Sequence, residues 1–260
     1  MTYELIKLNT ARNCLRYVIR AFRIKELYVP YYICSAVRIA ASKEDCQIIY
    51  YHINTKFEPQ GDLPKSAYIL YPNYFGVCSD IVNKMDEEYP NLIVDNAHSF
   101  FSEPKGIASF NSIRKFFPYL RDGAFLYTKS VLNEIFPDSD YKYELKELDY
   151  KDFIENEARL DSENILLMSD CTLNYFNKVD INKEKERILN KFNNCQKKYG
   201  QIKISKGDIP YKYPILKKTD AEADTLVKEL ESEGSTIFRY WHNLPQNFPE
   251  YSLYKRLVAI

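Results

Sequence analysis

The fold is decided by the stretch from residue 92 to residue 98, Leu92-Ile93-Val94-Asp95-Asn96-Ala97-His98. A short, wholly apolar run that ends at an acid is typical of a strand buried on both faces, as in a parallel sheet. In open α/β sheets, ligands gather outside the carboxyl ends of the strands. The stretch therefore predicts both a fold class and the place of a site.

Short apolar runs alternate with helical patterns on both sides of this stretch. Thr10 is expected to cap a first helix, whose apolar residues recur at helical spacing up to Phe22. Further strands are expected at 27–29, 47–51, 67–71, 107–110 and 124–127, and further helices at 33–42 and 77–88. This alternation predicts an α/β protein with a mainly parallel central sheet that helices flank.

The second half of the chain has a different pattern. Residues 139–163 are rich in charge and predict a solvated connection or an exposed helix. The segments that follow predict a helix at 182–199, a strand at 211–216, a helix at 220–233 that Thr219 caps and Gly234 ends, and a final strand at 235–240. We therefore expect a large α/β domain over 1–165 and a small C-terminal α+β domain over 166–260.

Bulk composition excludes several classes of protein. Lysine plus arginine equals aspartate plus glutamate, 36 against 36, so no basic excess favours nucleic acid as a partner. The 6 cysteines show no C-x-x-C spacing, which argues against a metal site or a redox motif. Neither a signal-peptide pattern nor an apolar run of membrane-spanning length is apparent. We expect a cytoplasmic protein with no membrane partner.

Three features lie at predicted strand or helix ends. Asp95 leaves a buried strand, Lys115 follows the strand at 107–110 by a few residues, and Thr10 begins the first helix. A carboxylate, an amine and a helix N-terminus are the anchors that pyridoxal 5′-phosphate (PLP) requires, for its ring nitrogen, its aldehyde and its phosphate. Taken singly, each has a plainer interpretation: a turn residue, a solvated charge and a cap.

The order of these blocks resembles that of the DegT/DnrJ-type sugar-nucleotide aminotransferases, which are fold type I PLP enzymes. The resemblance rests on Asn9-Thr10-Ala11-Arg12 near the start, on Asp95-x-Ala97-His98, and on Ser109-Phe110 followed by Lys115 and Asp122-Gly123-Ala124. Weaker similarities occur at 27–32, 54–59, 74–76, 212–215 and 238–241. Together they cover most of residues 5 to 260 and imply the aspartate aminotransferase-like fold of PLP-dependent transferases.

The resemblance implies a role for each block. Lys115 would be the Schiff-base and proton-shuttling residue, Asp95 would pair with the pyridine nitrogen, and His98 would pack near the ring hydroxyl. Tyr32 is the candidate to stack on the ring, with Tyr31 and Cys34 as rivals. The phosphate would be held by Ser109 or Ser112 and by the helix end that Thr10 begins, with its backbone amides at Ala11 and Arg12.

The resemblance also implies the reaction and the partners. Such enzymes transfer an amino group, usually from glutamate, to a nucleotide-linked keto sugar for surface polysaccharides or deoxysugars. Their sites are built at a subunit boundary, so a homodimer is expected.

Two departures leave an alternative open. Arg114 occupies the usual register position of the lysine, and the Gly-Tyr-Asn-x-Arg block has no clear match around residues 167–170. The alternative is a catalytically inactive, truncated relative that serves as a binding or regulatory partner in the same pathway. A nucleotide-binding protein without PLP is disfavoured, because the sequence has no Gly-rich phosphate loop.

Overall fold

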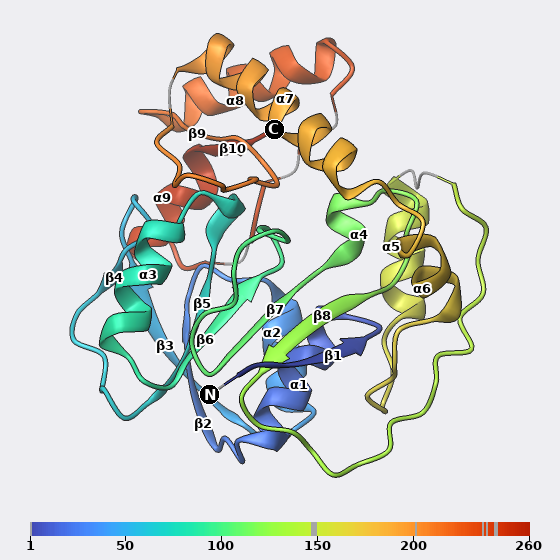
Figure 1. The fold of residues 1–260 in the computed structure, drawn as a ribbon. Coiled ribbons are helices and arrows are strands. Elements are labelled where there is room, and N and C mark those ends of the chain that lie inside the picture. The colour runs from blue at the N-terminus through green and yellow to red at the C-terminus, as the bar shows by residue number, and fades with distance from the viewer. Residues whose placement is uncertain (1, 147–149, 201, 236, 238, 242–243) are drawn as a thin grey trace.

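The computed structural model describes residues 2–146, 150–200, 202–235, 237, 239–241 and 244–260. One sheet of eight strands forms its centre, in the order β1-β8-β7-β6-β5-β2-β3-β4 (Figure 1). The strands are β1 (Glu4–Leu8), β2 (Glu26–Pro30), β3 (Gln47–Ile53), β4 (Pro59–Gln60), β5 (Tyr68–Pro72), β6 (Leu92–Asn96), β7 (Ala108–Asn111) and β8 (Ala124–Thr128).

The five strands β3, β2, β5, β6 and β7 run parallel, whereas β8, β1 and β4 pair antiparallel. The prediction of a mainly parallel sheet is confirmed. The edge strand β1 was not expected, because Glu4 and Lys7 interrupt its apolar pattern. The chain leaves β2 for β3 on one side and later returns to β5 on the other, so the direction of winding reverses between β2 and β5.

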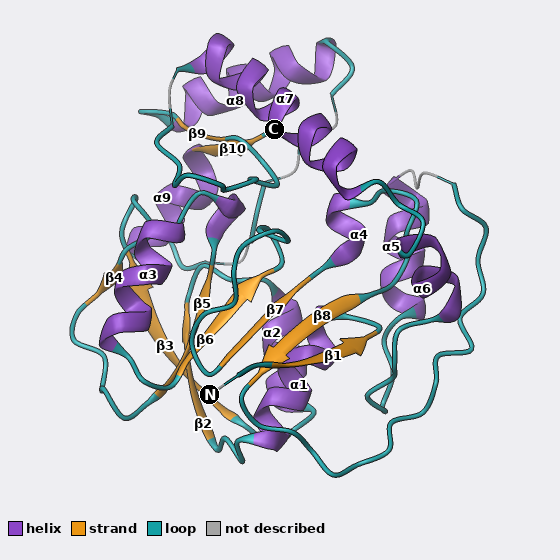
Figure 2. Cartoon of the chain, in the orientation of Figure 1, coloured by secondary structure: helices purple, strands orange, loops and turns teal. Residues whose placement is uncertain are grey.

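Helices cover both faces of this sheet (Figure 2). On one face lie α1 (Ala11–Ala21) and α2 (Ser35–Ser42), and α3 (Ser79–Glu88) lies on the other. Strand β6 contacts both layers: Ile93 packs in the core with α1 and α2, and Leu92 and Val94 pack in the core with α3. Burial on both faces is the physical reason for the unbroken apolar run.

The second half of the chain adds a small two-stranded sheet and more helices (Figure 1). The elements are α5 (Tyr150–Arg159), α6 (Asp170–Phe176), α7 (Ile181–Tyr199), β9 (Pro214–Leu216), α8 (Asp220–Ser232), α9 (Pro249–Arg256) and β10 (Leu257–Ala259). Thr219 caps α8 as expected, and its Oγ1 accepts from the Glu222 amide at 3.2 Å. The domain boundary at 165/166 stays a prediction.

The predicted final strand at 235–240 is wrong for its described residues 235, 237, 239 and 240; residues 236 and 238 lie outside the described part. Strand β9 pairs instead with β10, where Val258 lies opposite Ile215. Tyr240 packs edge-on against Phe75 at 5.2 Å between ring centroids. Contact with the turn after β5 therefore takes the place of a strand ladder at this point.

Helix α9 attaches the small sheet to the large one. The fully buried Glu250 carboxylate accepts from the Ile53 amide at 2.7 Å and lies 3.0 Å from His52 Nδ1. The described part of the chain contains no helix of the length and apolar character needed to cross a bilayer.

Candidate functional site

Asp95 is the next-to-last residue of β6 and lies half-buried. It pairs in register with Phe110 of β7, on the face of the sheet that Ile93 shares. Its Oδ1 accepts from the Ala97 amide at 2.8 Å. Burial raises the pKa of Asp95, and the positive charge of Lys115 acts in the opposite direction. A carboxylate that accepts from a single backbone donor retains capacity to bind a further donor.

Lys115 lies in α4 (Ile113–Phe116), a single helical turn that follows β7. Burial lowers its pKa from the ordinary value of 10.5, and the charges of Cys34 and Asp95 oppose that effect. Within the described structure, no hydrogen bond or ion pair joins Lys115 to Asp95, although each acts on the pKa of the other. Nζ of Lys115 lies 5.9 Å from the centroid of the Tyr211 ring, and its burial biases the amine toward the neutral, nucleophilic form.

The first turn of α1 is the third predicted anchor. Thr10 is its N-cap, as expected, and its Oγ1 accepts from the Asn13 amide at 3.2 Å. The amides of Ala11 and Arg12 belong to the helix end that lacks carbonyl partners within the helix. These N–H groups are available to an anion.

A carboxylate already lies close to this turn. Glu157 of α5 forms an ion pair with Arg114, and its Oε2 lies 3.9 Å from Nη2 of Arg12. Burial, followed by the charge of Arg12, lowers the pKa of Arg114 to about 10. The two arginines and Glu157 form a charged cluster that sequence spacing did not suggest, because Glu157 lies 145 residues after Arg12 in the chain.

His98 is buried in an aromatic cage. Its Nδ1 accepts from the Phe75 amide at 3.3 Å, and Trp241 stacks over the ring at 5.9 Å with an interplanar angle of 8°. Burial lowers the pKa of His98, and the charges of Lys115 and Lys212 lower it further. The imidazole is therefore neutral, and its position beside Lys115 is fixed by packing.

The turn after β5 makes this packing possible. Phe75 and Gly76 both adopt positive φ, 55° and 80°. A Cβ at Gly76 would lie 2.4 Å from the carbonyl oxygen of His98 and 2.8 Å from Cα of Pro210. Glycine is thus required by a close approach of three segments. The aromatic-Gly pattern at 74–76 was visible in the sequence, but its contact with His98 was not.

The two candidate serines differ in position. Ser109 pairs with Val94 in β7 and β6, so its side chain points to the opposite face from Asp95. Its Oγ also accepts from Asn96 Nδ2 at 2.9 Å. Ser112 is the N-cap of α4, next to the turn that carries Lys115. Of the two, Ser112 is the better placed for a group beside Lys115.

The three candidates for ring stacking have different surroundings. Tyr32 is fully buried, with Tyr74 stacked on it at 5.9 Å and Trp241 edge-on at 4.7 Å, and its hydroxyl has no hydrogen-bond partner in the described structure. Tyr31 stacks on Tyr50 at 4.8 Å. Cys34, at the N-cap of α2, is exposed and interacts electrostatically with Lys115. Of the three, Cys34 is the one whose charge acts on the pKa of Lys115.

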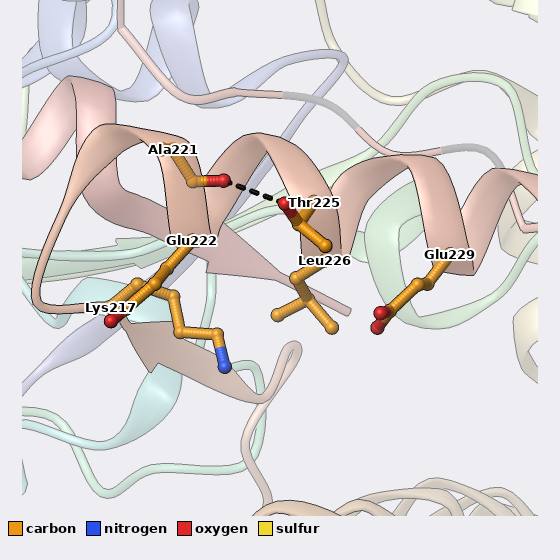
Figure 3. Close-up of a pocket in the computed structure, with 6 residues that line it drawn as sticks. All are labelled: Lys217, Ala221, Glu222, Thr225, Leu226 and Glu229. Carbon is orange, nitrogen blue, oxygen red and sulfur yellow. Dashed lines mark hydrogen bonds between the residues drawn. The ribbon is translucent and has the colours of Figure 1, made fainter.

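Two hollows lie on the surface near the small sheet. One, of about 240 Å³, adjoins Lys115, and sequence reasoning missed it. It is lined by Lys115, Phe116, Pro118, Arg187, Ile188, Lys191, Phe192, Cys195, Pro210, Tyr211, Lys212, Tyr213 and Ile260. The other, of about 330 Å³, lies along α8, and its side chains include Glu222 and Glu229 (Figure 3). The predicted site residues are not among those that line it.

Comparison with solved structures identifies the fold. The chain aligns over 100% of its length with 80% of a DegT DnrJ EryC1 StrS aminotransferase from Brucella abortus, at TM-score 0.59 and 14% identity. A protein assigned as a sugar aminotransferase of Streptococcus pneumoniae gives TM-score 0.61 at 12% identity, covering 100% of this chain and 81% of its own. Helicobacter pylori PseC, an aminotransferase involved in the biosynthesis of pseudoaminic acid, gives a TM-score of 0.57 at 12% identity. The alignment covers 98% of this chain and 80% of PseC.

This chain therefore has the fold of the PLP-dependent sugar aminotransferases, and the expected fold class is confirmed. Comparison with protein-family models and with curated proteins found no match. The described residues contain no group of histidine, cysteine and acidic side chains that could hold a metal ion.

Proposed function

We propose that this chain is a PLP-dependent aminotransferase that transfers an amino group, from glutamate, to a nucleotide-linked keto sugar. The observation that carries the proposal is the relation of Asp95 to Lys115. Asp95 lies near the carboxyl end of β6, and Lys115 lies in α4, directly after the neighbouring strand β7. Each acts on the pKa of the other, and no ion pair joins them in the described structure. This is the arrangement that a small aromatic cofactor between them needs, on a fold shared with enzymes of this class.

The residues of this site fit PLP at each of its polar ends. Asp95 has carboxylate capacity left for the ring nitrogen, and Lys115 has a partly desolvated amine for the aldehyde. The amides of Ala11 and Arg12, with the hydroxyl of Ser112, would take the phosphate. When bound, PLP supplies an electron sink next to the carbon that loses or gains the amino group.

The protein's own groups then carry out the proton movements. Nζ of Lys115 accepts and releases the proton that moves during amino-group transfer. It can do so because burial brings the pKa of Lys115 closer to the working pH than the pKa of a free lysine. Asp95 would hold the pyridine nitrogen of bound PLP in its protonated form through a charge-assisted hydrogen bond. His98 and the aromatic side chains around it exclude water from one side of the site.

The substrate class is supported by the structural neighbours rather than by a shape in this chain. The pneumococcal protein has been solved in PLP and PMP forms, and the Helicobacter aminotransferase is involved in the biosynthesis of pseudoaminic acid. We place the product in surface polysaccharide or deoxysugar synthesis, in the cytoplasm. We also propose a homodimer as the active unit, which light scattering of the active protein would test.

Titration of the purified protein with PLP tests the proposal. A visible absorption band should appear, disappear in Lys115→Ala, and persist in Lys65→Ala, which removes an exposed lysine elsewhere. Added glutamate should then convert the band, as the first half of the transfer. If Lys115→Ala kept the band, as Lys65→Ala should, the role of Lys115 would be refuted. A protein that shows no band at saturating PLP would instead support the inactive, partner-binding alternative.

A further inference from the structure

The hollow beside Lys115 has an unusual balance of charge. Four of the side chains that line it are basic: Lys115, Arg187, Lys191 and Lys212. Among the described residues that line it, none is aspartate or glutamate. The hollow along α8 is the opposite case, because Glu222 and Glu229 face a single lysine there (Figure 3). Local charge of one sign in a concave site concentrates ligands of the other sign.

The hollow is formed by three segments that the fold brings together. Arg187 of α7 donates from Nη2 to the carbonyl of Phe116 at 3.1 Å, which fixes α7 against α4. The amide of Lys212 donates to the Phe75 carbonyl at 3.4 Å, and the Tyr211 amide donates to the carbonyl of His98 at 3.2 Å. The same contacts that position His98 therefore position the wall that carries Lys212.

Lys212 and Lys191 are the two cations whose charge is least compensated. Lys212 is half-buried, its Nζ lies 5.5 Å from the Tyr211 ring centroid, and its charge acts on His98. Burial and the charge of Lys191 lower the pKa of Lys212 to about 8. Arg187, by contrast, is already paired with Glu184 at 2.8 Å. Two like charges held together in a hollow are stabilised by an anion between them.

We infer that Lys191 and Lys212 form an anion subsite next to Lys115, and that it takes the diphosphate group of the substrate. The inference rests on the proposed function, because Lys115 lies in the same wall and marks the reacting end. A diphosphate bound there would place the sugar that it carries beside the amine. Lys115 itself is kept for the cofactor, so the subsite is made by Lys191 of α7 and by Lys212, which precedes β9.

Inorganic pyrophosphate is the probe, with its binding measured by titration calorimetry at low salt. Lys212→Met and Lys191→Met should each weaken binding at least about tenfold, as expected for one lost charge-assisted contact. Lys212→Arg should restore it. Lys197→Met is the matched control: it removes one charge from the same helix α7 at a residue outside the hollow, and should change affinity less than about twofold.

Each other outcome overturns the inference. Absence of pyrophosphate binding to the wild type, or equal weakening by Lys197→Met, would reduce the hollow to general surface charge. Loss of pyrophosphate binding after saturation with PLP would assign the hollow to the cofactor phosphate. None of these results bears on the absorption band of Lys115, so failure of the subsite is distinct from failure of the proposed function. As a control for folding, Lys212→Met should unfold cooperatively, as the wild type does, so that weaker binding is not due to loss of the fold.

Discussion

Two carboxylates of the large sheet region, Asp95 and Asp122, have very different surroundings. Asp122 accepts from the amide and hydroxyl of Ser169 at 2.8 and 2.7 Å and from the hydroxyl of Thr172. Asp95 accepts from one backbone amide, and no hydrogen bond or ion pair joins it to Lys115 in the described part of the chain. Burial raises the pKa of both. Asp122 is thus satisfied within the protein, whereas Asp95 is not.

The difference separates a structural acid from a binding acid. Asp122 fixes the N-terminus of α6 through its hydrogen bonds to Ser169 and Thr172. The next residue, Gly123, packs closely against the same helix, because a Cβ there would lie 2.9 Å from the Thr172 methyl. Asp95 is half-buried and keeps acceptor capacity that Asp122 has used, so it is the one of the two that can bind a further donor. The following changes test this contrast.

The largest effect is expected for Asp95→Asn. The amide cannot hold a proton on the facing ring nitrogen, so the transamination rate should fall by about 10²- to 10³-fold. The fold should be unaffected, because an uncharged side chain avoids the desolvation that raises the pKa of Asp95. Single-turnover kinetics with glutamate measure the loss, and Asp122→Asn serves as the control at the other carboxylate. A similar rate in wild type and Asp95→Asn would contradict the assignment.

Asp122→Ala should act on stability instead. It leaves three buried donors without their acceptor, at a cost of about 3 kcal/mol in the free energy of unfolding. Urea denaturation measures this cost, and PLP titration of the folded variant should still give the absorption band. If Asp122→Ala lost the band while keeping the stability, Asp122 would be the binding acid and the contrast with Asp95 would fail.

The pH dependence of PLP capture sharpens the contrast further. The neutral amine of Lys115 reacts, so the rate should rise with pH and level off above the pKa of Lys115, which burial places below 10.5. The negative charge of Asp95 raises that pKa, so Asp95→Asn should move the midpoint to lower pH. Asp122→Asn should leave it in place. Stopped-flow absorbance gives the profile; a midpoint at or above 10.5 would exclude a desolvated amine.

The smallest effect is expected at the N-terminus of α1. Glu157→Gln removes a negative charge beside Arg12 and Arg114, so an incoming phosphate meets less repulsion. Affinity for PLP should tighten by about two- to fivefold. Fluorescence or absorbance titration measures it, with the exposed Glu186→Gln as control. Weaker binding in Glu157→Gln would show that this carboxylate supports the site instead of competing for it.

Most of the large sheet could be predicted, because its strands and helices follow local periodicity. Strands β2, β3, β5, β6, β7 and β8 and helices α1, α3, α7 and α8 form close to the predicted ranges. The predictions failed where tertiary contact decides, as at β10, whose three residues become a strand only by pairing with β9. Residues 235–240 carried a strand pattern, yet Tyr240 packs on Phe75.

By itself, the sequence determined the α/β class and the chain positions of Asp95, Lys115 and Thr10, because strand and helix ends are read from local patterns. It could not determine which distant groups meet. Three contacts join segments that are separate in the sequence: Glu157 approaches Arg12, aromatic rings surround His98, and Lys191 and Lys212 line the same hollow. Such contacts arise from packing and desolvation, which act through space, so only the tertiary structure decided them.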